Sequence, residues 1–432
     1  MKTFRLFNSK QIKTAAIGSL FIKFLSVLFT FLSSIILARV LGLEQFGLYT
    51  LAFATVVLLT VPVSFGLPNL IIRFISKYEV ENNNNAIKGL LIRTNQFVIV
   101  TTLIIWVIVI ISYYLWWKNM NAILVEAIWY GLLLVPLIVL SSIQASILNG
   151  LRYVVLGQLS DTIFRNGLIL VGVTIYYVFE LKLTPGKAII IHIIATTISF
   201  LLGFFFLKRK LLFKIRNIIP VFYDKEWFKQ ALPFSITSGI QVIKSKLITY
   251  ILAIFGSIES VAIFDIALRG ASLAAFTLDA LNTAIAPYIS YTFEKKNMKR
   301  LQQILTKTSR IIFIFAIPVV LFFIIGGKPL LVFLFGKEYE ASYLPLVILC
   351  IGQLVNTATG SVGILLAMTG RQAVFTKVIL VSVILNLFLS VPFVMYFDTL
   401  GAAIVYSSLM AIQNIYLVFY VKSRLNFNTT IF

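Results

Sequence analysis

The sequence predicts an all-α membrane protein with about 12 transmembrane helices. Of its 432 residues, 60% are hydrophobic and only 12% are charged, and the mean hydropathy is +0.99. Soluble domains carry roughly 25% charged residues, because the protein surface in contact with water must be largely polar. Apolar runs of membrane-spanning length recur along the whole chain and are separated by short basic segments. These observations predict that lipid is the main solvent of the protein.

Each predicted span is an apolar run long enough to cross a bilayer. A hydrocarbon core of about 30 Å requires about 20 apolar residues in a helix. The first run follows a basic segment and is long enough to be a retained helix instead of a cleaved signal peptide. The predicted spans cover residues 15–38, 46–72, 95–117, 123–148, 162–179, 188–207, 232–254, 260–291, 311–326, 343–368, 376–397 and 400–421.

The distribution of lysine and arginine predicts the orientation. With the N-terminus on the cytoplasmic side, most of the 37 basic residues fall in cytoplasmic segments. This asymmetry is the positive-inside rule, and it places both termini in the cytoplasm. It also accounts for the net charge of +22 without a nucleic-acid partner. Only six basic residues fall in the outer segments: Arg39, Lys118, Lys182, Lys187, Lys328 and Lys337.

An internal repeat predicts two six-helix lobes. LGLEQFGLY at 41–49 follows the first span, and FGSIESVAIF at 255–264 follows the seventh. Pro68 likewise corresponds to Pro287, and Gly150 to Gly370. We expect an N-terminal lobe at 1–207, a cytoplasmic linker at 208–231 and a C-terminal lobe at 232–432. An even number of spans per repeat predicts a pseudo-two-fold axis along the membrane normal, with the substrate site between the lobes near the midplane.

The first span carries a lysine in the middle of a polar stripe. Lys23 is followed by Ser26, Thr30 and Ser33 at steps of three and four, which places them on one side of a helix. Charged residues inside a membrane are expensive and tend to face a wet cavity. Two interpretations stay open: Lys23 contacts substrate, or its long side chain extends to the cytoplasmic interface.

The eighth span carries two carboxylates and an arginine on one face. Asp265 and Arg269 are four residues apart, the spacing of an intrahelical ion pair. Such a pair either serves transport or only neutralises itself. Asp279 has no partner at helical spacing, so it is matched from another helix or titrates with a raised pKa. Asp279 and Asp265 are therefore our candidates for coupling transport to H⁺ or Na⁺.

The seventh span carries Lys244 and Lys246. Two steps along a helix rotate by about 200°, so the two side chains cannot point in the same direction. The helical wheel does not decide which of them faces a cavity. With Lys23 and Arg269 they make the predicted cavity mostly cationic, which suits an anionic substrate such as the pyrophosphate head of a lipid.

The remaining polar residues predict structural roles and no metal or cofactor. Asp161 and Arg165 have the spacing of a second ion pair. The lone histidine, His192, excludes a multi-histidine metal site and is more often a packed residue than a proton carrier. The single cysteine, Cys350, excludes a disulfide framework. We expect no catalytic residues and no bound cofactor.

The stretch ARVLGLEQFGLY (38–49) resembles the first-loop signature of the bacterial polysaccharide transporter family, the O-antigen and teichuronic-acid type flippases. ALPFSI (231–236) and LFGKEYEAS (334–342) extend the resemblance, which covers nearly the whole chain. The family belongs to the multidrug, oligosaccharidyl-lipid and polysaccharide exporter superfamily of alternating-access carriers. Arg39 matches the motif arginine of the family and joins the candidate substrate-binding residues.

The resemblance implies a flippase of the bacterial cytoplasmic membrane for surface polysaccharide assembly. Its substrate would be a lipid-linked anionic oligosaccharide on undecaprenyl pyrophosphate, carried from the cytoplasmic to the outer leaflet. Its partners would be membrane lipid, a polysaccharide polymerase and glycosyltransferases. An ion-coupled multidrug or small-molecule exporter of the same superfamily is the alternative.

A membrane enzyme such as a glycan polymerase is disfavoured by the sequence. Such an enzyme typically needs a sizeable external loop with carboxylates for acid–base or metal chemistry. Here the outer carboxylates are scattered over separate loops: Glu44, Glu126, Glu180, Glu259, Glu338, Glu340 and Asp398.

Overall fold

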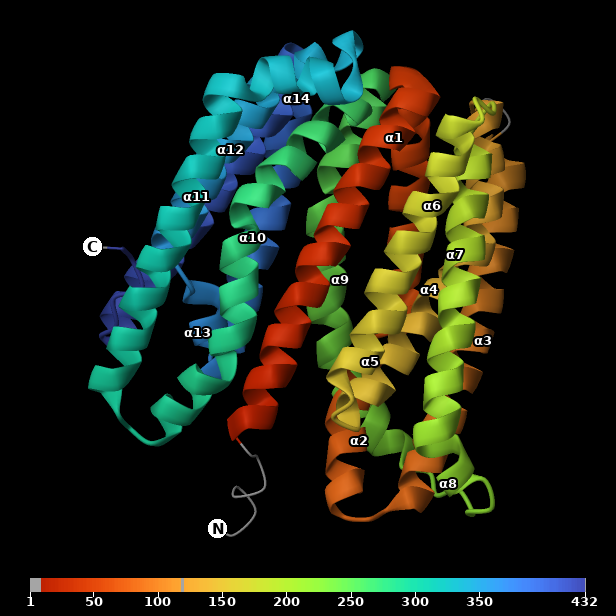
Figure 1. Cartoon of the computed structure of the whole chain (residues 1–432), viewed down its shortest axis with the longest axis vertical. Coiled ribbons are helices and arrows are strands. Elements are labelled where there is room, and N and C mark those ends of the chain that lie inside the picture. The colour runs from red at the N-terminus through yellow and green to blue at the C-terminus, as the bar shows by residue number, and fades with distance from the viewer. Residues whose placement is uncertain (1–8, 118–119, 432) are drawn as a thin grey trace. The chain divides into compact units, whose positions relative to one another are not determined.

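The computed structural model describes residues 9–117 and 120–431, and within these residues it contains helices and turns without strands (Figure 1). Every long helix is rich in apolar residues. The elements in chain order are α1 (Ser9–Ser64), α2 (Leu67–Val80), α3 (Asn84–Trp116), α4 (Ala122–Gly150), α5 (Val154–Gln158), η3 (Leu159–Phe164), α6 (Arg165–Val178), α7 (Pro185–Leu207), η4 (Lys208–Leu212), α8 (Phe213–Ile215), α9 (Asp224–Phe255), α10 (Ile258–Glu294), α11 (Met298–Phe335), η5 (Lys337–Ser342), α12 (Tyr343–Thr359), α13 (Val362–Met368) and α14 (Gln372–Leu425).

The predicted total of about 12 spans is confirmed. In the described residues, ten helices are long and apolar enough to cross a membrane. Two of them, α1 and α14, contain a residue with non-helical dihedral angles that divides each into two helices. The break in α1 is at Gly42 (φ 74°, ψ 174°), inside the first-loop motif. The break in α14 is at Asp398 (φ 48°, ψ −127°), between the two predicted last spans.

The second predicted span, 46–72, is shorter in the structure. Its helix ends at Ser64, and Phe65 and Gly66 adopt positive φ before α2 begins. A Cβ atom on Gly66 would lie 2.5 Å from the backbone nitrogen of Ser235, so only glycine allows α9 to approach here. Pro68 lies in the first turn of α2, where its missing N–H leaves no helical bond unmade.

The tenth predicted span, 343–368, is also interrupted. α12 ends at Thr359, Gly360 has φ of 71°, and the separate short helix α13 follows. A Cβ atom on Gly360 would overlap the Ser309 hydroxyl and the carbonyl oxygen of Thr429. The C-terminal segment therefore packs against the break, and Ser309 donates a hydrogen bond of 2.6 Å to the Thr429 carbonyl.

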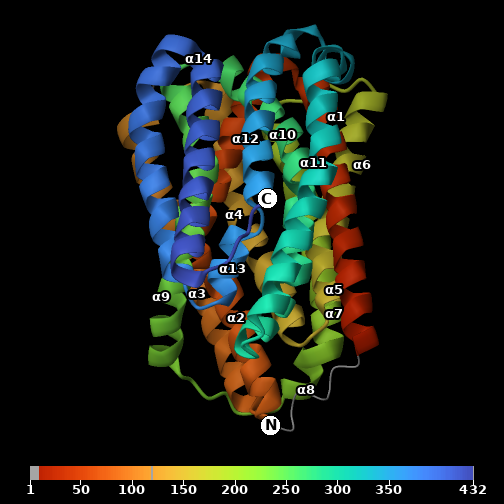
Figure 2. The same ribbon diagram turned by 90° about the vertical axis from the view of Figure 1, so that its left-hand side faces the viewer.

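The chain forms two compact units, Met1–Val242 and Ile243–Phe432, each with its own buried core. In the first unit, α4 packs on α1, α2 and α7, and Leu134 and Leu148 of α4 are fully buried. In the second unit, α12 packs on α10, α11 and α14 (Figure 2). Two lobes of six spans are therefore confirmed. The lobe boundaries predicted from the sequence, at 207/208 and 231/232, stay a prediction.

The predicted linker, 208–231, is packed against the first unit over part of its length. It continues from α7 through η4 and α8, and then runs without helix to Asp224. Backbone and side-chain atoms at the start of α3 hold this extended part. Lys88 Nζ donates to the Arg216 carbonyl (2.8 Å), and Asn85 Nδ2 donates to the Ile219 carbonyl (2.8 Å). The Val221 N–H donates in turn to the Asn85 carbonyl (3.0 Å).

Candidate functional site

The second unit contains the ion pair predicted on the eighth span. Arg269 Nε lies 2.5 Å from Asp265 Oδ2, one turn apart on α10. Both side chains are largely shielded, with exposed fractions of 29% for Arg269 and 16% for Asp265. A shielded pair retains more of its attraction than a surface pair, because little water screens it. The pairing predicted from the four-residue spacing is confirmed.

Lys246 of α9 lies within electrostatic reach of this ion pair. Its ammonium group interacts with both Asp265 and Arg269. The phenol of Tyr339, in η5, is 1% exposed and also lies within reach of Asp265. A second cation therefore lies near the carboxylate that Arg269 already pairs with, which leaves a local excess of positive charge.

Lys244 points away from that cluster. Its Nζ atom donates a hydrogen bond of 2.7 Å to Oε1 of Gln413, in the second part of α14. The two lysines therefore contact different helices, as the 200° rotation between them predicts. α9 presents one cation towards α10 and the other towards α14. Near Asp265 the site therefore has two cations, Arg269 and Lys246, against one carboxylate. Such an arrangement can bind an anion through charge-assisted hydrogen bonds.

The two candidate coupling carboxylates are not in one site. Asp265 and Asp279 are fourteen residues apart on the continuous helix α10, which separates them by about 21 Å at 1.5 Å per residue. Asp279 is exposed, and its backbone carbonyl accepts a hydrogen bond from the Thr283 hydroxyl (2.9 Å). Any ion coupling must therefore use one of the two carboxylates in a local role.

The two candidate cations of the first unit are also far apart. Lys23 and Arg39 lie sixteen residues apart on α1, which is about 24 Å along the helix. Lys23 is half-buried and Arg39 is exposed. On the predicted polar stripe, Ser26 accepts a hydrogen bond from Asn166 of α6 (2.8 Å), and Ser33 is buried. At least part of the stripe therefore packs inside its own unit.

The histidine and the second predicted ion pair have structural surroundings. His192 Nε2 lies 2.8 Å from the Tyr49 hydroxyl, and its ring packs 5.0 Å from that of Phe53. Arg165 and Asp161 form their expected ion pair (3.2 Å) at the π-helical turn that begins α6. These contacts fit the packed roles predicted for them.

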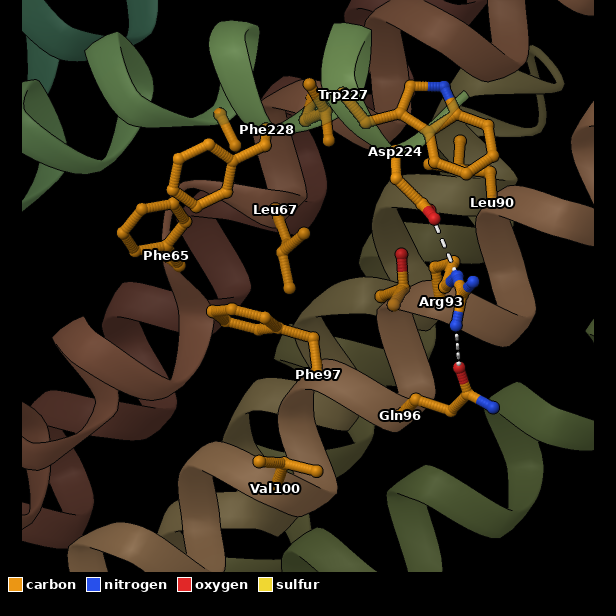
Figure 3. Close-up of a pocket in the computed structure, with 13 residues that line it drawn as sticks. Phe65, Leu67, Leu90, Arg93, Gln96, Phe97, Val100, Asp224, Trp227 and Phe228 are labelled. Atoms are coloured by element: carbon orange, nitrogen blue, oxygen red, sulfur yellow. Dashed lines mark hydrogen bonds and ion pairs between the residues drawn. The ribbon is translucent and has the colours of Figure 1, made fainter. Parts of the chain in front are cut away.

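Figure 3 shows a pocket in the first unit, formed where α2, α3 and the start of α9 meet. It holds about 620 Å³, within the range of small-molecule sites. The lining is mainly apolar and aromatic. Phe65 stacks on Phe228 (5.5 Å between ring centroids) and tilts against Phe97 (5.4 Å).

Polar groups of this pocket gather at one side (Figure 3). Arg93 Nε donates to Asp224 Oδ1 (3.0 Å), and its Nη1 donates to Gln96 Oε1 (3.0 Å). Beside the lining, Trp227 Nε1 donates to the hydroxyl of Tyr78 (2.9 Å), and burial raises the pKa of Tyr78. An apolar cavity with a few convergent polar groups is typical of ligand sites.

Sequence patterns had indicated neither Gln413 nor this pocket as functional. Gln413 is a polar residue inside an apolar run, a signal that could have been used. The Arg93–Asp224 contact joins residues 131 positions apart, and no local spacing predicts it.

A family model described as polysaccharide biosynthesis protein matches residues 15–293, more than half of the chain. The chain belongs to the polysaccharide biosynthesis protein family. A second family model, MatE, matches residues 233–391. Both matches place this family member in the multidrug, oligosaccharidyl-lipid and polysaccharide exporter superfamily predicted from its first-loop motif. It is a multi-pass membrane protein of a transporter superfamily.

A relative of known sequence also matches this chain. Stage V sporulation protein B of Bacillus subtilis (strain 168) is 23% identical over 338 residues, which cover 73% of this chain and 65% of that protein. The matched region thus spans about two thirds of the relative's length.

Two solved structures share the fold of this family member. An inward-facing multidrug resistance MATE family transporter has a TM-score of 0.81 at 15% identity, covering 95% of this chain and 98% of that chain. The lipid II flippase MurJ in an inward closed conformation has a TM-score of 0.72 at 16% identity, covering 94% and 87%. At these identities the likeness shows the fold alone.

Proposed function

We propose that the protein is a flippase that carries a lipid-linked anionic oligosaccharide from the cytoplasmic to the outer leaflet. The observation that carries this proposal is the cationic cluster inside the second unit, in a chain of the polysaccharide biosynthesis family. Arg269 pairs with Asp265, and Lys246 lies within electrostatic reach of both. Lys244 extends from the same helix as Lys246 towards α14. Cations at membrane depth are costly and are retained where they serve a pathway.

In this mechanism the cluster binds the pyrophosphate that joins glycan to lipid. Arg269 is oriented by Asp265, so its remaining N–H groups are directed before the substrate arrives. Lys246 adds a second positive charge to the same region. The prenyl tail stays in the bilayer, and alternating access exposes the bound head to the outer side. Lys23 and Arg39 act at other depths, on the glycan or on the approaching lipid.

For ion coupling we propose Asp279 ahead of Asp265. Asp265 is already engaged in an ion pair with Arg269 on its own helix. Asp279 is exposed on the same helix, where an ion can reach it. A proton or Na⁺ at Asp279 would change the charge of α10 once per cycle.

The proposed location is the bacterial cytoplasmic membrane with both termini in the cytoplasm, on the basis of the lysine and arginine distribution. The proposed pathway is surface polysaccharide assembly of the O-antigen type, with a polymerase and glycosyltransferases as partners. None of these roles requires catalytic residues in this chain.

The test is made on the carrier lipids of cells that lack the protein. We expect an undecaprenyl-pyrophosphate oligosaccharide to accumulate, inaccessible to reagents outside the cell. Re-expressed wild-type protein should clear it, and the Lys244→Gln, Lys246→Gln double variant should not. Lys299→Gln, an exposed lysine at the start of α11, is the matched control and should behave as wild type. Normal sidedness of the carrier in the deleted strain, or clearance by the double variant, would contradict the proposal.

The second candidate function is export of small amphipathic molecules. The pocket of Figure 3 favours it, because it is apolar and has an ion pair at one side. The MatE match supports the same alternative. Filling the pocket with Val100→Trp should then raise the drug sensitivity of cells that overproduce the protein. If Val100→Trp abolishes carrier-lipid clearance and leaves drug sensitivity unchanged, this second candidate function is rejected.

A further inference from the structure

The second unit has a groove in α14. The break at Asp398 divides this helix into a first arm, 372–397, and a second arm, 399–425, and the groove lies between them. Its lining follows one face of each arm: Lys377, Val378, Val381, Ser382 and Leu385 on the first, and Leu409, Ile412, Gln413 and Tyr416 on the second. The spacing of three and four residues on both arms means that two helical stripes face one another. Figure 2 shows the two arms side by side. The groove holds about 380 Å³.

The groove has a length and an exposure that suit a lipid chain. From Lys377 to Leu385 it extends about 12 Å along the helix, close to the ~15 Å of one leaflet of the hydrocarbon core. Val381 and Ile412 are 56% and 61% exposed, so the groove is open at the surface. Its walls are apolar apart from Ser382, Gln413 and the lysine at one end.

That end is strongly cationic. Lys377 is exposed in the second turn of α14, and Lys422 and Arg424 lie exposed in the last turn. Arg371 Nη1 lies 3.5 Å from the Tyr420 hydroxyl, which brings the start of the first arm beside the end of the second. Between residues 341 and 432 the sequence has a single carboxylate, Asp398, at the opposite end of both arms. Lys377, Lys422 and Arg424 on the two arms, with Arg371 just before the first arm, thus offer four cations at this end of α14, and the arms carry no acidic side chain there.

We propose that this groove binds an anionic phospholipid, with one acyl chain between the arms of α14 and the phosphate on Lys377. The charge at the groove end selects the phosphate, because anionic head groups are attracted to basic residues at the membrane surface. The apolar stripes bind the chain by burying it. A prenyl chain of a carrier lipid is much longer than a 12 Å groove, so the membrane phospholipid is the occupant that fits.

One residue of the groove lining also contacts the candidate site. Gln413 lines the groove, and its Oε1 accepts the hydrogen bond from Lys244. A chain in the groove therefore packs against the residue that positions Lys244. The bound phospholipid would hold the second arm of α14, and with it Gln413, in place.

The test uses the purified full-length protein and native mass spectrometry. Phosphatidylglycerol and phosphatidylcholine with identical acyl chains are titrated separately. We expect wild type to retain phosphatidylglycerol preferentially. Lys377→Gln should reduce that preference about fivefold, the effect of one basic residue near the surface. Lys299→Gln, on α11, should leave it unchanged.

A second pair of variants tests the groove itself. Val381→Trp fills it and should abolish retention of the preferred lipid. Leu387→Trp places the same side chain at a similarly exposed position outside the lining and should retain it. Ratios between the two lipids are compared within each variant, so a general loss of stability does not mimic the effect. Equal retention of both lipids by wild type, or displacement of phosphatidylglycerol by undecaprenyl phosphate alone, would overturn the proposal.

Discussion

Lys244 and Gln413 lie 169 positions apart in the sequence and form a 2.7 Å hydrogen bond between α9 and α14. The lysine is half-buried and the glutamine is 8% exposed. This contact fixes the direction of a candidate substrate-binding cation. It is also the point at which the second arm of α14 acts on that cation.

Replacing Gln413 with leucine should destabilise the protein by about 1–2 kcal/mol, because a half-buried ammonium loses an acceptor in an apolar environment. Lys244→Met should cost a similar amount. The double variant should lose less stability than the sum of the two single variants, because it leaves no half-buried ammonium of Lys244 without an acceptor. Thermal unfolding in detergent measures all three. Gln372→Leu, at an exposed position of α14, should change stability by less than about 0.5 kcal/mol.

Asp265→Asn should destabilise the protein more than Arg269→Gln. Removing the carboxylate leaves two cations, Arg269 and Lys246, close together in a shielded region. We expect a loss of about 1–3 kcal/mol, below the value for a fully buried pair because both side chains are partly exposed. Asp265→Asn with Arg269→Gln should recover stability without recovering carrier-lipid clearance. Recovery of both would remove Arg269 from substrate binding.

Gly42→Ala should destabilise the protein by about 1–3 kcal/mol through the backbone, since φ 74° with ψ 174° is accessible essentially to glycine. No atom lies within 4 Å of the added Cβ, so steric overlap contributes nothing. Gly326→Ala is the matched comparison. It lies inside α11 with its nearest neighbour 3.9 Å away, and should be neutral or stabilise by about 0.5–1 kcal/mol. Unfolding midpoints that fall equally in both variants would refute the backbone explanation.

Asp398→Ala should destabilise the protein more than Asp398→Asn. Asn tolerates the positive φ at this turn and still offers an oxygen to the Ser260 hydroxyl, which donates to Asp398 Oδ2 over 2.5 Å. Alanine loses both advantages, and we expect a difference of about 1–2 kcal/mol between the two variants. Ser260→Ala should add little when introduced into Asp398→Ala. A full additional loss there would mean that Ser260 has another essential contact.

The number and order of spans could be predicted from the sequence, because about 20 apolar residues per span is a local property. The turn at Gly42 lies inside the first-loop motif, and the turn at Asp398 falls between two predicted spans, so both could be expected. The breaks at Gly66 and Gly360 could not be predicted. Each depends on a distant backbone segment, at Ser235 and at Thr429, that approaches the glycine.

In the candidate site, too, contacts within one helix could be predicted and contacts between helices could not. The Asp265–Arg269 pair was predicted, since its two members are one turn apart on a single helix. The divergence of Lys244 and Lys246 was predicted from helical rotation, but their partners were not. Contacts such as Lys244 with Gln413 depend on how helices pack, and no spacing within one helix contains that information.

The non-helical stretch at 216–223, which is hydrogen-bonded to the start of α3, has a practical consequence for fusion proteins. A fluorescent reporter inserted at 219–221 would break the hydrogen bonds that tie this stretch to Asn85. Insertions are tolerated best where the backbone is exposed and makes few such bonds. The turn at 295–297, between α10 and α11, is exposed throughout, and a reporter placed there leaves that attachment intact.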